Sequence, residues 1–82
     1  MTKQEFEGHF AQILRRIKGN PDLRPPRSDE SLWDAGYLTS FTMVEVIAAL
    51  ESLLGRELVL SADALKSFYS VDRIFDTYLA GA

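Results

Sequence analysis

The stretch from Ser40 to Leu54 constrains the fold more than any other part of the chain. It contains neither Gly nor Pro, and Gly55 follows it directly. Thr39 or Ser40 can supply a side-chain oxygen that caps the first turn of a helix, and glycine readily adopts the left-handed conformation that ends one. The sequence therefore predicts a helix from Ser40 to Leu54.

Two apolar stripes run along this predicted helix. At about 100° per residue, the broader stripe can face a core, and it consists of Met43, Val46, Ile47, Leu50, Leu53 and Leu54. The narrower stripe lies on the other side of the helix and consists of Phe41, Val44 and Ala48. Two interpretations of the narrower stripe stay open: a surface on which another molecule docks, or a second part of the core.

Ser40 lies at the start of the predicted helix, where unpaired N–H groups and the positive end of the helix dipole favour a phosphate ester. A self-activated nucleophile is not expected there. The single histidine, His9, is distant in sequence, and no Ser-His-acid set follows from the spacing. His9 also has no second ligand at a plausible spacing, so we expect no metal site. On local physics alone, helix capping is the commoner role for such a serine.

A second helix is predicted near the N-terminus, ending at about Lys18. Thr2 and Glu5 have the spacing of a capping box, and Gly19 is suited to end the helix. Its apolar face consists of Phe6, Phe10, Ile13, Leu14 and Ile17. Three cations, Arg15, Arg16 and Lys18, fall in its last turn. We interpret them as a solvated helix end, and a basic patch for an acidic partner is the alternative.

The segment from Gly19 to Thr39 sustains no helical period and contains all three prolines. A loop this long in a compact domain is usually functional or pinned. We expect a single helical turn at Ser31–Asp34. Five side chains are predicted to pin the loop to the core: Leu23, Leu32, Trp33, Tyr37 and Leu38.

The C-terminal part is predicted to contain one short and one longer helix. Residues 56–61 alternate in polarity, but they have no partner strand, so we expect an extended connector. Ser61 is expected to cap a short helix ending at Lys66, and Ser70 to cap the last helix. The apolar face of that helix consists of Val71, Ile74, Phe75, Tyr78 and Leu79. Residues 80–82 are expected to fray.

These elements predict an all-α fold: a small four-helix bundle with three main helices, one short helix and a long first loop. With 82 residues, the chain is expected to form a single domain, residues 1–82, that is too small for an enzyme with a deep cleft. We expect a monomer.

Composition narrows the classes of function. The chain has no cysteine, so any thioester chemistry needs a sulfur from another molecule. A formal net charge of −3 argues against nucleic acid as the main partner, and no candidate recognition helix carries the basic residues of a DNA binder. No apolar run approaches the roughly 20 residues that span a bilayer, and the N-terminus lacks the residue order of a signal peptide. We therefore expect no membrane insertion and a cytoplasmic location.

The segment Gly36-Tyr-Leu-Thr-Ser-Phe41, followed by Val44-Glu45 and Leu50-Glu51, resembles the signature of acyl and peptidyl carrier proteins. That signature usually has a Gly and a Leu shortly before Asp-Ser-Leu or Asp-Ser-Phe, at the start of the second helix. The resemblance extends from about Leu32 to Tyr78. Within the family, the chain is more similar to stand-alone D-alanyl or aminoacyl carriers than to fatty-acid carriers. Thr39 departs from the usual Asp, which is thought to help the modifying enzyme and its metal bind.

The resemblance implies a carrier rather than an enzyme, with 4′-phosphopantetheine attached to Ser40. A phosphopantetheinyl transferase would supply this arm from coenzyme A, and the thiol of the arm would hold an acyl or aminoacyl group as a thioester. Further partners would be an acyl- or amino-acid-activating ligase (an adenylation enzyme) and a downstream acyl-accepting enzyme. The residues expected to contact partners are Tyr37, Leu38, Thr39, Phe41, Val44, Glu45 and Ala48. The alternative is a small helical protein–protein interaction module without a prosthetic group, in which Ser40 is only a cap.

Overall fold

The computed structural model describes residues 1–58 and 64–79, and these residues form helices and connecting loops without any strand. The helical segments are α1 (Lys3–Lys18), α2 (Ser40–Leu54), α3 (Ala64–Ser67) and α4 (Val71–Tyr78). The predicted all-α class is therefore confirmed. Within the described ranges, no helix is both long enough and apolar enough to cross a membrane.

Helix α1 begins and ends at the residues that the sequence predicts. The Thr2 hydroxyl accepts a hydrogen bond from the Glu5 N–H at 3.1 Å, and the Thr2 N–H donates to Glu5 Oε1 at 3.0 Å. This reciprocal pair is a complete capping box. At the other end, Gly19 adopts the left-handed conformation with φ 65°, and its N–H donates to the Arg16 carbonyl at 3.2 Å.

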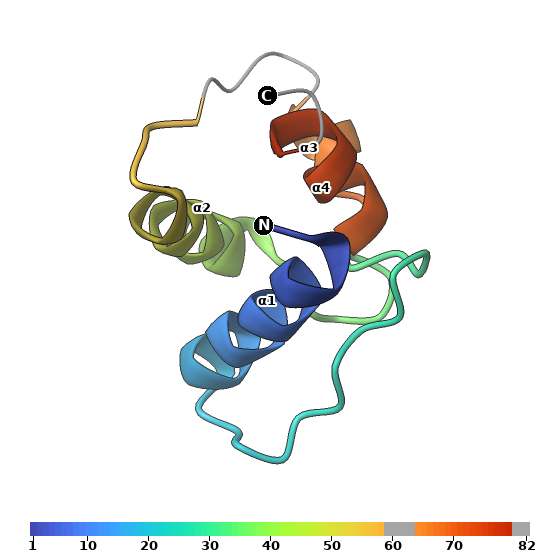
Figure 1. The fold of residues 1–82 in the computed structure, drawn as a ribbon. Coiled ribbons are helices and arrows are strands. Elements are labelled where there is room, and N and C mark those ends of the chain that lie inside the picture. Colours follow the sequence, from blue (N-terminus) through green and yellow to red (C-terminus); the bar gives the residue numbers. More distant parts are fainter. Residues whose placement is uncertain (59–63, 80–82) are drawn as a thin grey trace.

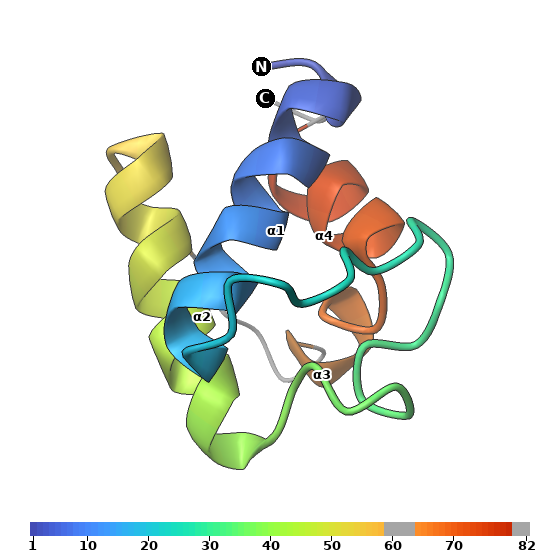
Figure 2. The same ribbon diagram turned by 90° about the horizontal axis from the view of Figure 1, so that it is seen from below.

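Helix α1 is central to the arrangement. It packs against both α2 and α4, and Figure 2 shows it between them, with α2 running in the opposite direction to α1. In Figure 1 it lies below the two other helices. The Phe6 ring lies 5.7 Å from the Phe10 ring and 5.8 Å from the ring of Phe75 on α4. Aromatic contacts at this spacing are favourable, so they help to hold α4 against α1. The buried core consists of Phe6, Phe10, Ile13, Leu14, Leu32, Tyr37, Leu38, Val46, Leu50, Leu58, Phe68, Val71 and Ile74.

The long first loop, residues 19–39, is attached by backbone hydrogen bonds to the start of α4 and to the segment just before it. The Leu32 N–H donates to the Tyr69 carbonyl at 2.8 Å, and the Asp72 N–H donates to the Ser28 carbonyl at 2.9 Å. Figure 2 shows the loop passing beside α1 and α4 before it reaches the start of α2. All five predicted pins pack into or against the core: Leu23, Leu32, Trp33, Tyr37 and Leu38.

The helical turn predicted at Ser31–Asp34 is present within this loop. The Ala35 N–H donates to the Ser31 carbonyl at 3.0 Å, which is the bond of one α-helical turn. The Tyr37 N–H then donates to the Leu32 carbonyl at 2.9 Å, so the chain folds back toward the core. This fold directs the chain into α2.

Helix α4 is capped as predicted. The Ser70 hydroxyl accepts a hydrogen bond from the Arg73 N–H at 3.2 Å. The predicted apolar face is confirmed, since Val71 and Ile74 are buried and the other three members pack against the core: Phe75, Tyr78 and Leu79.

The short helix differs from its predicted range. Helix α3 spans Ala64–Ser67, so the predicted segment from Ser61 to Lys66 is confirmed over residues 64–66, and the helix continues to Ser67. The predicted cap Ser61, residues 59–61 of the connector and the predicted frayed end, residues 80–82, lie outside the described residues.

Candidate functional site

Ser40 is the first residue of α2, and it is exposed. The cap of the helix is its neighbour Thr39. The Thr39 hydroxyl accepts a hydrogen bond from the Thr42 N–H at 3.2 Å, and the Thr39 N–H donates to the Thr42 hydroxyl at 2.7 Å. The Ser40 hydroxyl makes no hydrogen bond to any residue that the structure describes. Of the two capping candidates in the sequence, Thr39 is therefore the one that is used.

The backbone at the start of α2 leaves two donors available. Within the described ranges, the N–H groups of Ser40 and Phe41 make no hydrogen bond. The first turn of α2 contains no acidic side chain. Unpaired N–H groups and the positive end of the helix dipole attract anions. A phosphate ester on the Ser40 hydroxyl would thus lie beside free donors, with no carboxylate opposing it in this turn.

The segment that precedes Ser40 is held in place by side chains from elsewhere in the chain. The Tyr37 hydroxyl donates to the Arg24 carbonyl at 2.7 Å, and Lys18 Nζ donates to the Gly36 carbonyl at 2.6 Å. Gly36 has φ 84°, a conformation that side-chain-bearing residues adopt only with strain. The hydroxyl of Ser40 therefore projects from a well-anchored turn.

The side chains of Tyr37 and Leu38, which were predicted both to pin the loop to the core and to contact partner proteins, are buried. Tyr37 is 5% exposed and Leu38 is 2% exposed, and both belong to the core. The physical reason is the backbone fold that returns both residues toward the interior, where burial of their apolar surface is favourable. Fewer of the predicted contact residues around Ser40 have exposed side chains than the sequence suggests.

The narrower apolar stripe of α2, formed by Phe41, Val44 and Ala48, lies on the surface. Phe41 is 84% exposed, Val44 is 67% exposed, and Ala48 is also exposed. The interpretation of this stripe as a second part of the core is therefore excluded. Glu45 and Thr39 are exposed as well, so five of the seven predicted contact residues are accessible.

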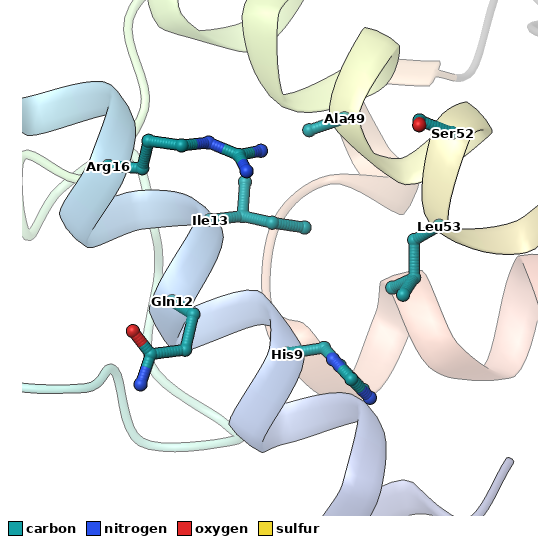
Figure 3. A pocket seen from close by; sticks show the side chains of 7 residues that line it. All are labelled: His9, Gln12, Ile13, Arg16, Ala49, Ser52 and Leu53. Carbon is teal, nitrogen blue, oxygen red and sulfur yellow. The ribbon is translucent and has the colours of Figure 1, made fainter.

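A groove between α1 and α2, which we call the α1–α2 groove, was not predicted. It has a volume of about 240 Å³, and Figure 3 shows Arg16 extending from α1 toward Ala49 on α2. His9 lies on the same side of α1. His9 and Arg16 are seven residues apart, and this i, i+7 spacing was the only sequence pattern that placed both on one face of α1. Which helix packs against that face depends on the tertiary structure, so this spacing alone could not predict the groove.

Comparison of the chain with protein-family models, with curated proteins and with solved structures gave no match.

Proposed function

We propose that the protein is a stand-alone carrier that holds an acyl or aminoacyl group as a thioester on a 4′-phosphopantetheine arm attached to Ser40. The observation that supports this most is the state of the Ser40 hydroxyl. It is exposed and makes no hydrogen bond to the described residues, while Thr39 caps the helix. A hydroxyl that the helix does not need for capping can be esterified without loss of local structure.

Ser40 and the first turn of α2 would each have a defined role in the attachment. The Ser40 oxygen forms the new bond to the phosphorus of coenzyme A and gives its proton to a base of the transferase. The bond from that phosphorus to the nucleotide part breaks, with Mg²⁺ on the transferase assisting. The free N–H groups of Ser40 and Phe41 then stabilise the charge of the phosphodiester. The arm supplies the thiol that the chain itself lacks.

The partners would be the transferase, an acyl- or amino-acid-activating ligase and a downstream acyl-accepting enzyme. In this proposal the three longer helices and α3 correspond to the four-helix bundle of the carrier family, and the chain is a cytoplasmic monomer that catalyses nothing itself. Partner enzymes would contact the narrower apolar stripe beside Ser40, which offers the large exposed side chain of Phe41.

Docking is proposed to depend on apolar contact more than on charge. Fatty-acid carriers resemble this chain but usually present a dense row of acids on the second helix, whereas only Glu45 and Glu51 occur here. Glu51 is engaged within the fold, because its Oε2 accepts a hydrogen bond from the Leu58 N–H at 3.0 Å. Glu45 is thus the one acid of α2 whose carboxylate makes no hydrogen bond or ion pair to the described residues.

The experiment incubates the chain with coenzyme A and a broad-specificity phosphopantetheinyl transferase and weighs the product by mass spectrometry. The wild type is expected to gain one arm, and Ser40→Ala none. Ser52→Ala is the matched control, because it removes another exposed serine of α2, and it is expected to gain one arm. Thr39→Asp restores the residue usual in the family and is expected to raise the initial rate. No gain in the wild type, or a gain in Ser40→Ala, would overturn the proposal.

A second candidate is a helical protein–protein interaction module without a prosthetic group. Two observations favour it: the exposure of Phe41 and Val44, and Thr39 in place of the usual Asp. Under the same conditions this module gains no mass, so one experiment separates the two functions.

A further inference from the structure

The α1–α2 groove combines an apolar floor with a polar rim. Its floor is formed by Ile13, which is 7% exposed, and by the half-buried Ala49 and Leu53. Four exposed side chains stand at its rim: His9, Gln12, Arg16 and Ser52. Figure 3 shows that the rim residues come from both helices, with Arg16 on α1 and Ser52 on α2.

Arg16 differs from the other cations near the end of α1 in what it contacts. Arg15 Nε donates to the Leu23 carbonyl at 3.0 Å, and Lys18 Nζ donates to the Gly36 carbonyl. Arg24 forms an ion pair with Glu30 at 3.1 Å. Among the described residues, neither Arg16 nor His9 has a carboxylate within 4.0 Å or any hydrogen bond of its side chain. The guanidinium at this rim is therefore available to a ligand.

We propose that the α1–α2 groove binds a small aliphatic carboxylate. The planar guanidinium of Arg16 matches a carboxylate in a two-point hydrogen bond, and Ser52 or His9 can donate one more. The aliphatic chain lies on Ile13, Ala49 and Leu53, which removes apolar surface from water. A volume of about 240 Å³ is below the roughly 300–1,000 Å³ of drug-sized sites, so a short chain is the suitable size.

Two simpler anions fit the groove less well. Inorganic phosphate would bind the rim but leave the apolar floor uncovered. Acetate has the carboxylate without the chain, so it gains little from the floor. The site is also separate from Ser40, and its occupation does not require the phosphopantetheine arm. If the groove binds no carboxylate, the carrier proposal is unaffected. If Ser40 is not modified, the proposal for the groove is equally unaffected.

The test is a titration of the unmodified, ¹⁵N-labelled chain with sodium butanoate, followed by NMR chemical-shift changes. Butylammonium chloride and sodium acetate, at the same ionic strength, are the comparison ligands. Butanoate is expected to give saturable shifts of the backbone amides that line the groove, with a dissociation constant of about 1 mM. Butylammonium is expected to give none there, and acetate is expected to bind several times more weakly.

Three variants identify the parts of the site. Arg16→Gln is expected to weaken butanoate binding roughly tenfold, because it removes a charged hydrogen-bond donor. Ala49→Leu fills the groove without a change in charge and is expected to weaken binding by a similar factor. Arg27→Gln is the control, because it removes the same charge from an exposed loop position outside the groove, and binding is expected to stay unchanged. Circular dichroism verifies that each variant is folded.

Several results would overturn the proposal. One is a butanoate titration without saturation, and another is equal shifts with butylammonium. If Arg27→Gln weakens binding as much as Arg16→Gln, the effect is one of net charge and not of this groove. If acetate binds as tightly as butanoate, the apolar floor contributes nothing, and the assignment of an aliphatic ligand is wrong.

Discussion

Thr39 and Thr42 form two reciprocal hydrogen bonds at the start of α2. The Thr42 N–H donates to the Thr39 hydroxyl at 3.2 Å, and the Thr39 N–H donates to the Thr42 hydroxyl at 2.7 Å. A capping box usually has Glu or Gln in the second position, and here an uncharged threonine takes that place. Helix capping and the accessible hydroxyl are consequently assigned to adjacent residues, Thr39 and Ser40.

The first prediction concerns the stability of α2. Thr39→Ala should lower the free energy of unfolding by about 1 kcal/mol, because it removes the cap. Ser40→Ala should change it by less than about 0.5 kcal/mol, because the hydroxyl makes no bond to the described residues and alanine favours helix. Urea denaturation followed by circular dichroism measures both. The account fails on this point if Ser40→Ala proves the more destabilising change.

The second prediction concerns docking. Phe41→Ala should lower kcat/KM of the transferase for the chain about tenfold, since truncation of a central aromatic contact is costly in interfaces. Its free energy of unfolding should stay within about 0.5 kcal/mol of wild type, because Phe41 is 84% exposed. Glu45→Lys is the comparison variant and should have the smaller effect. Unchanged turnover with Phe41→Ala, together with loss of turnover with Glu45→Lys, would show that charge governs docking.

The third prediction concerns the attachment of the first loop. Leu32 is fully buried, so Leu32→Ala should cost roughly 2–5 kcal/mol of unfolding free energy. Leu23→Ala, at a half-buried position of the same loop, should cost less. Chemical denaturation of the two variants measures the difference. Equal costs would mean that Leu32 is not the principal anchor of this loop.

The fourth prediction concerns pH. The Arg24 guanidinium and then the Arg27 N–H hold the pKa of Glu30 below its ordinary value of 4.5. A carboxyl with a lowered pKa contributes stability that is present above pH 4.5 and is lost as the pH falls through the pKa of the folded state. Glu30→Gln should therefore be destabilising at pH 7, and its difference from wild type should shrink toward pH 3.

Urea midpoints at several pH values between 7 and 3 measure this difference. Asp29→Asn is the control, because it removes a neighbouring exposed acid of the same loop. A difference between Glu30→Gln and wild type that stays constant or grows as the pH falls would contradict the role given to the Arg24–Glu30 pair.

The ends of the helices could be predicted from the sequence because they depend on local chemistry. The capping box of α1 is formed by Thr2 and Glu5, and α1 and α2 end at Gly19 and Gly55. Each of these residues bonds within one turn of its own helix. The apolar stripes could be predicted for a similar reason, because the period of a helix determines which residues share a face. Ser40 could be placed at a helix start for the same reason, and Thr39 remained one of two candidates for its cap.

The path of the first loop could not be predicted, because it depends on contacts between residues far apart in the sequence. The bond from the Leu32 N–H to the Tyr69 carbonyl joins segments that no periodicity relates. Tyr37 and Leu38 were predicted both to pin the loop to the core and to contact partners, and the path of the loop buries both side chains. The α1–α2 groove is likewise a product of helix packing, so neither His9 nor Arg16 could be assigned to it beforehand.

The most direct measurement of the central claim is the location of the modified residue. The chain is incubated with coenzyme A and the transferase, digested, and analysed by tandem mass spectrometry. The account predicts that the phosphopantetheine mass is found on Ser40 alone. Modification of Thr39, Thr42 or Ser52 instead, or an unmodified chain after complete reaction of a known carrier in the same tube, would contradict it.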